Sequence, residues 1–252
     1  MTGPVCYHLE GGVATITIDD KKVNALSHQV LTDIDRALDR AAADDATVVL
    51  TGRPGVFSAG FDLRVLRAAG APGPALMRAG FELAARMLSF RRPVVIACSG
   101  HAIAMGAFLL LSGDYRIGAA GPYKITANEV AIGLTMPRPA IEICRQRLAP
   151  AHFTRVVLNA ETYTPDGAIS AGFLDLVTGQ EQLTDAAGDA ARQLQLLDAD
   201  AHAATKLRAR ETALAALRAA IDSDYAVDSD YSAGADYAAG ADYAAGAAAA
   251  PA

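Results

Sequence analysis

Two segments of the chain repeat one arrangement: a run of apolar residues, a loop of small residues and the expected start of a helix. The first leads from residues 48–50 to a helix near Asp62, and the second from residues 94–96 to a helix near Met105. Helix N-termini leave backbone N–H groups unpaired, and small residues let a ligand approach the backbone closely. Two such ends that converge would surround a developing oxyanion with donors. The same turn also serves packing alone, so the pattern leaves both interpretations open.

The hydrophobic pattern predicts the elements that must position these loops. Alternating apolar residues around Gly11 and Gly12 predict a hairpin. Ser27, a residue type that favours helix N-caps, precedes apolar residues at helical spacing. We expect an α/β fold with strands at 5–9, 13–18, 47–50, 94–97 and 114–118, a loop at 53–59, and helices from 27 and at 75–90, 104–112, 139–148, 152–158 and 166–171, with two more long helical segments within 185–222.

The composition suits one domain with a well-filled core. Of 252 residues, 52% are hydrophobic and 6% aromatic, which favours Ala, Val, Leu and Ile packed in helices and parallel strands. The net charge of −6 belongs to the C-terminal part, where six aspartates and no Lys or Arg follow residue 221. The remainder is balanced in charge, so the chain lacks the basic surface of a nucleic-acid-binding protein.

Cysteine usage and the hydrophobic runs indicate a cytoplasmic protein. Cys6, Cys98 and Cys144 are scattered without the spacing of a metal site, so we expect reduced thiols and no metal. Residues 1–10 do not show the pattern of a secretory leader. Residues 94–113 carry no formal charge and reach the length of a membrane span, but the residues at 98–101 divide them. We expect a strand, a turn and a buried helix there, and no membrane partner.

The C-terminal residues differ in kind from the rest. From Asp224 onward, Asp-Tyr pairs recur every six residues. Tyrosines at that spacing would spread around a helix instead of forming a stripe, and the glycines between the later pairs oppose a stable helix. We expect residues 223–252 to form a low-complexity, flexible extension, with an ordered docking element as the alternative.

Five segments resemble the signature motifs of the enoyl-CoA hydratase/isomerase (crotonase) superfamily, in that family's order. Residues 56–63 resemble F-S-A-G-x-D-[LI], and residues 99–117 resemble N-G-x-x-x-G-G-G-x-x followed by C-D-Y-R-I. Residues 128–133 are similar to the motif in which a catalytic glutamate precedes an apolar triplet and a glycine. Residues 22–26 match an early N-A-L element, and residues 168–175 match a late A-x-x-x-G-[LF]-[VL]-D element.

The resemblance implies a fold and an assembly. The fold is a spiral of repeated β–β–α units, here residues 1–178, followed by C-terminal helices at residues 179–222. Together they make an acyl-CoA domain of residues 1–222, with residues 223–252 as the tail. In the family the C-terminal helices form trimers, often paired into hexamers, so we expect a homotrimer or hexamer.

The resemblance also implies a substrate and the residues that hold it. The substrate is a CoA thioester, and no cofactor is bound permanently. Its carbonyl oxygen accepts hydrogen bonds from two backbone N–H groups, which map to Phe61 and Met105. The family usually has glycine at the second position, but a backbone donor tolerates a side chain. The family's contacts on the adenine side of CoA map to Ala25, Ala59 and Leu63, and Lys22 is a candidate contact for the CoA phosphates.

The number of glutamates separates activities within this family. Hydratases use two, and at the first of these positions the chain has Phe108, while the second is retained as Glu129. Phe108 accepts no proton and makes that wall of the acyl pocket drier. One glutamate in a dry pocket suits a 1,3-proton shift, in which Glu129 converts a 3-enoyl-CoA into a 2-enoyl-CoA.

Other interpretations stay open at this point. A hydratase that manages water with one glutamate is one alternative, and a non-catalytic acyl-CoA-binding subunit is another. Glu129 itself has the ordinary interpretation of a surface carboxylate. We expect Asp62 to cap its helix, Asp114 to be structural, and His101 to be a hydrogen-bonded loop histidine.

Overall fold

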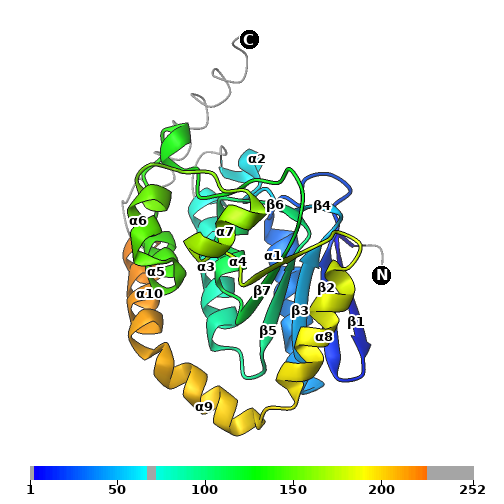
Figure 1. Cartoon of the computed structure of the whole chain (residues 1–252). Coiled ribbons are helices and arrows are strands. Elements are labelled where there is room, and N and C mark those ends of the chain that lie inside the picture. The colour runs from blue at the N-terminus through cyan, green and yellow to red at the C-terminus, as the bar shows by residue number, and fades with distance from the viewer. Residues whose placement is uncertain (1–2, 67–71, 226–252) are drawn as a thin grey trace.

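A six-stranded sheet runs through the molecule between layers of helices (Figure 1). The computed structural model describes residues 3–66 and 72–225. The predicted antiparallel hairpin is confirmed, with Gly11 and Gly12 at positive φ in its turn, and the other neighbouring strands pair in parallel. In their order across the sheet, the strands are β1 (Val5–Glu10), β2 (Val13–Ile18), β3 (Thr47–Gly52), β5 (Val94–Cys98), β7 (Tyr115–Ala119) and β9 (Leu176–Thr178).

A second, three-stranded parallel sheet corrects the sequence prediction. It consists of β4 (Gly55–Ser58), β6 (Gly100–Ile103) and β8 (Ile125–Thr126). Residues 53–59 and 98–101, expected to be a loop and a turn, therefore contain strands. The prediction was wrong because these strands are short and start with glycine, which strand statistics disfavour. A Cβ at Gly100 would overlap the backbone of Gly55, so the close approach of the two strands requires glycine.

The chain builds the two sheets as a spiral. After β3 comes β4 and then the helices α2 (Leu63–Leu66) and α3 (Pro72–Ser89). After β5 comes β6 and then α4 (Met105–Leu111), and after β7 comes β8 and then α5 (Arg138–Arg147). Each unit adds a strand to the large sheet, a strand to the small sheet and a helix. The small sheet therefore gathers the turns that precede α2, α4 and Glu129 at one end of the molecule.

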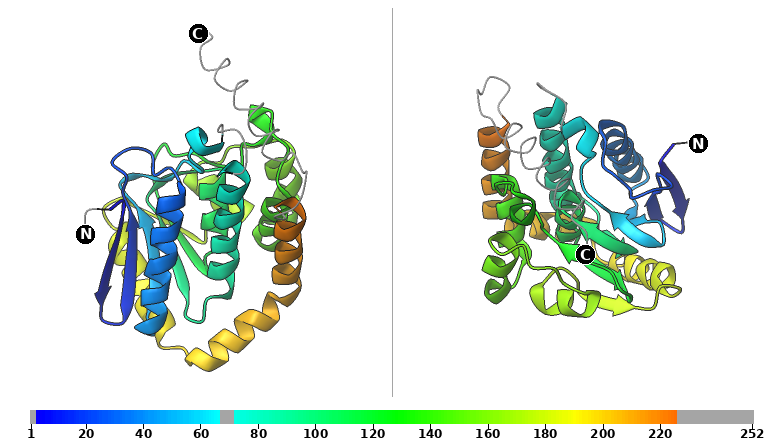
Figure 2. Two further views of the ribbon diagram at one scale, coloured as in Figure 1. Left: turned by 180° about the vertical axis from the view of Figure 1, so that it is seen from behind. Right: turned by 90° about the horizontal axis from the view of Figure 1, so that it is seen from above.

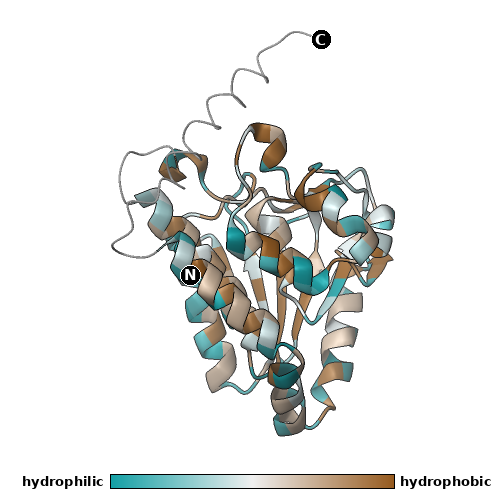
Figure 3. Ribbon diagram, turned by 90° about the vertical axis from the view of Figure 1, so that its left-hand side faces the viewer, coloured by the Kyte–Doolittle hydropathy of each residue, from teal (hydrophilic) through white to brown (hydrophobic). Residues whose placement is uncertain are grey.

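Helices cover both faces of the large sheet (Figure 2). The helix α1 (His28–Ala43) begins as predicted at Ser27, whose Oγ accepts a hydrogen bond from the backbone N–H of Val30. Together with α3 it buries one set of alternating strand residues, and α8 (Leu183–Gln195) buries the other set. Figure 3 shows the apolar strands enclosed by helices of mixed polarity.

The C-terminal region is divided more finely than expected. The two long helical segments predicted within 185–222 are three helices: α8, α9 (Ala199–Ala209) and α10 (Glu211–Asp224). The first break falls at Asp198, whose side chain caps α9 by accepting from the N–H of Ala201. In Figure 1, α9 crosses below the sheet and α10 returns beside α5. The remaining helices are α6 (Pro150–Val157) and α7 (Pro165–Ala171).

The uncharged residues 94–113 lie in the protein interior. They form β5, β6 and α4, and every residue of α4 is buried. The predicted strand and buried helix are confirmed, with β6 in place of the simple turn. Among the described residues, no helix combines the length and apolar character needed to cross a membrane.

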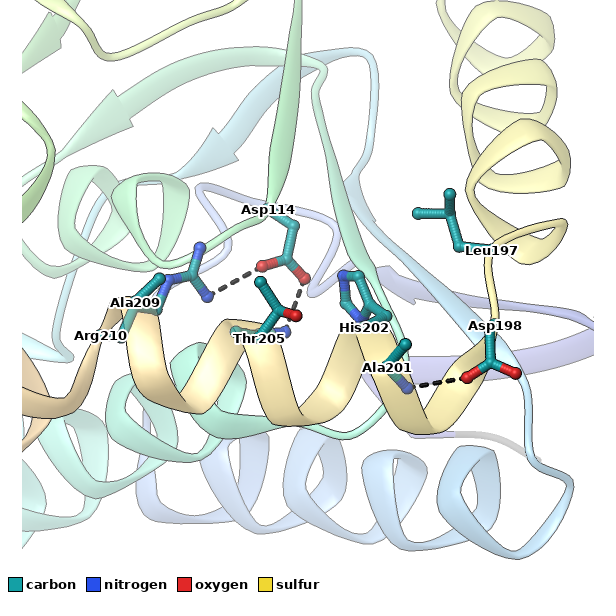
Figure 4. A pocket seen from close by; sticks show the side chains of 9 residues that line it. Asp114, Leu197, Asp198, Ala201, His202, Thr205, Ala209 and Arg210 are labelled. Carbon is teal, nitrogen blue, oxygen red and sulfur yellow. Dashed lines mark hydrogen bonds and ion pairs between the residues drawn. The ribbon is translucent and has the colours of Figure 1, made fainter.

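Asp114 ties α9 to the sheet (Figure 4). Its Oδ2 accepts from the backbone N–H of Val94 at 2.7 Å and from Lys206 Nζ at 2.6 Å, and its Oδ1 pairs with Arg210 at 2.8 Å. Lys206 is only 7% exposed, and burial lowers the pKa of its amine while the charge of Asp114 opposes that shift. These contacts agree with the structural role expected for Asp114.

Candidate active site

The first small-residue loop is held by Asn24, whose structural role the sequence did not reveal. Its backbone is in the left-handed region at φ 53°, which Asn tolerates better than most residues. Its buried Nδ2 donates to the carbonyl oxygens of Ile18, Val56 and Phe57 at 2.9, 3.2 and 3.1 Å. In return, Ser58 Oγ donates to the carbonyl of Asn24 at 2.8 Å. The segment 22–26 is thereby fixed along β4 and the loop that follows it.

Backbone pairing sets the direction of the Phe61 N–H group. Leu26 donates to the carbonyl of Gly60 at 2.8 Å, and Asp62 donates to the carbonyl of Leu26 at 3.0 Å. This is a parallel bridge between Leu26 and Phe61, in which the N–H of Phe61 faces away from Leu26. No backbone hydrogen bond recorded among the described residues uses that N–H.

The second loop meets the first at Met105. Met105 is the first residue of α4, so its N–H has no partner within the helix. A Cβ at Gly60, which has φ 89°, would lie 3.3 Å from the Met105 nitrogen and 3.0 Å from the carbonyl oxygen of Ile103. A Cβ at Gly106 would overlap the carbonyl oxygen of Ser58. Glycines thus allow the two loops to touch, and the N–H groups of Phe61 and Met105 belong to adjoining turns.

Glu129 lies on the neighbouring strand connection. The N–H of Ala104 donates to the carbonyl of Thr126 at 3.0 Å, so the chain leaves β8 beside the second loop and reaches Glu129 three residues later. Glu129 is 1% exposed, which contradicts the surface interpretation. Its Oε2 has no hydrogen-bond partner within the described part of the chain. Burial raises the pKa of Glu129 to about 7, and a hydrogen bond from its own backbone amide opposes the shift in part.

The Cys144 thiol on α5 faces the same interior region. Burial raises the pKa of Cys144, and the negative charge of Glu129 adds to this effect. Both groups are therefore in a setting that disfavours negative charge. A carboxyl group that titrates near neutrality in such a setting is suited to accept a proton and return it.

Phe108, the residue at the first hydratase glutamate position, belongs to a cluster of four aromatic rings centred on Phe81. Phe108 is 1% exposed, and its ring centroid lies 6.1 Å from that of Phe81 on α3. Phe81 also contacts the ring of Phe61 at 6.2 Å and stacks on Tyr225 at 6.0 Å. The expected boundary after residue 222 assigns Tyr225 to the tail, but this residue is 4% exposed and packs in the core. The rest of the expected tail, residues 226–252, lies outside the described residues.

The expected CoA contacts share one surface. Ala59 donates to the carbonyl of Val23 at 3.0 Å, which brings the segment with Lys22 and Ala25 beside the segment with Ala59 and Leu63. Ala25 and Ala59 are half-buried, whereas Lys22 and Leu63 are exposed. The surface is therefore apolar close to the loops and has a lysine at its edge.

Two polar residues of the loops have structural roles, as expected. Asp62 accepts from the backbone N–H and the guanidinium of Arg64, so it caps α2. His101 Nδ1 accepts from the N–H of Lys124 at 2.9 Å, and its ring packs on the edge of Tyr123. Within the described ranges, no three His, Cys, Asp or Glu side chains are grouped to hold a metal ion.

Comparison with known proteins agrees with this geometry. Residues 8–244 match the family model described as enoyl-CoA hydratase/isomerase. A probable enoyl-CoA hydratase of Mycobacterium avium is 29% identical over 85% of this chain and 79% of the relative. The human mitochondrial enoyl-CoA delta isomerase 1 is 30% identical over 84% of this chain and 72% of the relative. The apo structure of an enoyl-CoA isomerase from Mycobacterium tuberculosis is 47% identical, with a TM-score of 0.85 over 88% of this chain and 97% of that one. The chain belongs to the enoyl-CoA hydratase/isomerase family of enzymes.

Proposed function

We propose that the protein moves a double bond within an acyl-CoA thioester, converting a 3-enoyl-CoA into a 2-enoyl-CoA with Glu129 as its one proton shuttle. The observation that carries this proposal is the buried carboxyl group of Glu129, whose pKa is raised to about 7 and whose Oε2 is unpaired among the described residues. The position of a second hydratase glutamate holds the buried Phe108 instead.

The thioester carbonyl oxygen sits between the N–H groups of Phe61 and Met105. Removing a proton from C2 of a 3-enoyl thioester gives a dienolate whose negative charge lies mainly on that oxygen. Two fixed backbone donors stabilise this charge, and loss of one such donor costs about 3 to 4 kcal/mol in comparable oxyanion sites. The backbone supplies both donors, so the side chains of Phe61 and Met105 are free to be apolar.

The proton passes through one carboxyl group. Ionised Glu129 takes the proton from C2, the electron pair moves into the dienolate, and the protonated carboxyl returns the proton at C4. The double bond then lies between C2 and C3, and no other reactant is consumed. A pKa of about 7 supports this cycle, because neither protonation state is strongly favoured at neutral pH.

The CoA portion would lie over the segments 22–26 and 59–63. Backbone atoms of Ala25, Ala59 and Leu63 contact the adenine side, and Lys22 meets the phosphates. Lys22 is exposed, and its carbonyl accepts from Arg53 Nε at 2.9 Å, so a second cation lies nearby. CoA enters and leaves with the substrate and is not a resident cofactor.

Water addition to a 2-enoyl-CoA is the second candidate, because some relatives are named hydratases. The buried Phe108 disfavours it, since a phenyl ring packed against Phe81 holds no water at the position of the second carboxylate. A non-catalytic acyl-CoA-binding subunit is disfavoured by Glu129, because a buried carboxyl group without a charge partner brings binding no benefit.

Assembly into a homotrimer or hexamer is part of the proposal. The exposed apolar residues Leu196 and Leu197, between α8 and α9, and Leu207, within α9, support a subunit contact there. Multi-angle light scattering at micromolar concentration should give a trimer or hexamer mass. A monomer mass would remove assembly from the proposal and leave the chemistry to be tested separately.

The deciding experiment compares the two reactions directly. Purified protein is given a 3-enoyl-CoA or a 2-enoyl-CoA, and the conjugated thioester is followed by its ultraviolet absorbance. We expect absorbance to rise with the first substrate and to change little with the second. Fast loss of absorbance with the second substrate and no reaction with the first would establish a hydratase instead.

A further inference from the structure

The first Asp-Tyr pair of the C-terminal repeat is built into the protein interior. Asp224 and Tyr225 are each 4% exposed. Asp224 Oδ2 accepts from the backbone N–H of Arg138 at 2.8 Å, and its other oxygen pairs with the guanidinium of Arg138. Arg138 is the first residue of α5 and follows Pro137, so Asp224 caps this helix from a distant part of the chain.

A second clamp holds the same pair against α3. Arg78 donates to the carbonyl of Tyr225 at 3.0 Å and pairs with Asp222 at 2.9 Å. The Tyr225 ring lies nearly parallel to that of Phe81, with 13° between the planes. Tyr225 is thus fixed through its backbone and its ring to one helix, while its neighbour Asp224 is fixed to another.

The ring under Tyr225 is the centre of the aromatic cluster beside the oxyanion donors. Phe81 contacts both Phe61 and Phe108. The adjacent Gly80 leaves room for the side chains of Phe61 and Met105, because a Cβ at Gly80 would overlap the Phe61 ring and lie 3.4 Å from Cε of Met105. The apolar side of the proposed thioester site therefore continues from Phe61 and Met105 through Phe81 to Tyr225.

We infer that Tyr225, clamped by Asp224, limits the length of the acyl chain that the site accepts. This inference rests on the proposed acyl-CoA function. An acyl chain that starts between Phe61 and Met105 needs an apolar wall, and the cluster supplies one. Tyr225 stacks on Phe81 and so holds this wall in place. In this role Tyr225 is a positioning residue for specificity and takes no part in the proton transfer.

Affinity as a function of chain length tests this role whatever reaction the enzyme catalyses. Calorimetry with alkyl-CoA thioethers of increasing length measures this dependence. Each CH₂ group that becomes buried on binding improves the affinity about fourfold. We expect the gain to stop at a certain length in the wild-type protein. In Tyr225→Ala the gain should continue for two or more further carbons, making those longer ligands about fifteenfold or more tighter than in the wild type. Tyr225→Phe, which keeps the stacked ring, should restore the wild-type limit.

The matched control is Tyr7→Ala, which removes a tyrosine of the edge strand β1 that donates to Asp44 and should leave the length limit unchanged. Asp224→Asn removes the charge from the clamp and should lengthen the limit less than Tyr225→Ala does; it also tests the inference if Tyr225→Ala does not fold. An unchanged limit in folded Tyr225→Ala or Asp224→Asn, or a wild-type protein with no limit, would overturn the inference. A limit that shifts as expected in a protein without isomerase activity would overturn only the proposed reaction.

Discussion

Two carboxyl groups in this molecule, the partly buried Asp114 and the buried Glu129, differ in what surrounds them. Asp114 is held by Lys206, Arg210 and the backbone N–H of Val94. Glu129 has an oxygen without a partner among the described residues, and burial raises its pKa to about 7. A carboxylate surrounded by donors stabilises structure and is poorly placed to accept a proton, whereas an unpaired one is costly to bury and reactive. The two groups therefore differ in their partners: those of Asp114 fit a structural role, and their absence at Glu129 fits the catalytic role that we propose for it.

The largest expected effect is the loss of turnover in Glu129→Gln. The amide preserves the shape of the side chain but accepts no proton, and positioned acid–base catalysis contributes about 100- to 10,000-fold. We expect isomerisation to fall by a factor in this range while acyl-CoA binding changes little. Steady-state assays and calorimetry measure the two quantities, with Glu161→Gln, a glutamate paired with Arg155, as the matched control. Turnover that survives in Glu129→Gln would assign the proton transfer to another group.

Asp114→Ala should instead affect stability. It leaves Lys206 and Arg210 without their acidic partner in a buried setting, and breaking a buried pair costs about 3 to 5 kcal/mol. Urea unfolding should show a loss of this size, while activity per folded molecule stays near that of the wild type. Asp189→Ala, which breaks the exposed pair with Arg192, should change stability little. Equal losses of stability in Asp114→Ala and Asp189→Ala would contradict the structural role assigned to Asp114.

The pH dependence of stability should distinguish Glu129 from a paired acid. The pKa of Glu129 is about 7 in the folded protein against an ordinary value of 4.5, so between these values the folded state holds a proton that the unfolded state has lost. The stabilisation is complete below pH 4.5 and is lost as pH rises through 7, by roughly 3 kcal/mol in total. Glu129→Gln does not titrate, so its stability relative to the wild type should rise by about 2.5 kcal/mol, most of that amount, between pH 5 and pH 8.5. A difference in unfolding free energy that stays constant with pH would show that Glu129 is not shifted.

Phe108→Glu should have the smallest effect. It supplies the second carboxylate of a hydratase, but burial in an aromatic wall raises the pKa of the new group and keeps it protonated near neutrality. We expect water addition to 2-enoyl-CoA to rise by less than about tenfold, a small part of what a well-placed acid or base contributes, and only above neutral pH. Phe108→Gln, which does not titrate, is the control. If the two variants add water to 2-enoyl-CoA equally fast at high pH, the missing ionised carboxylate at position 108 is not the reason for the low hydratase activity of the wild type.

The sequence predicts some of these features and conceals others, for physical reasons. The β1–β2 hairpin and the start of α1 at Ser27 follow from local pattern and capping. The strands β4 and β6 have no such pattern, because glycines at their starts serve the close packing of the small sheet. The burial of Tyr225 is equally hidden, because the partners that hold it, Arg78 and Phe81, lie far away in the chain.

In the candidate site, too, the sequence predicts some features and conceals others. Glu129, Phe61 and Met105 are identified by motifs, and periodicity alone would not find them. The residue after Glu129, Val130, is 43% exposed, so neighbouring residues give no sign that the carboxyl group is buried. The partners of a carboxylate depend on tertiary contacts, as the distance in sequence between Asp114 and Lys206 illustrates.

The pH dependence of kcat/KM for isomerisation of a 3-enoyl-CoA tests the central claim most directly. If Glu129 is the base and titrates in the free enzyme near its raised pKa of about 7, the rate should fall tenfold per pH unit below that value and level off above it. The remaining activity of Glu129→Gln should lack this step. A wild-type rate that is constant from pH 5 to pH 9, or a step near pH 7 that persists in Glu129→Gln, would contradict the assignment of Glu129 as the proton shuttle.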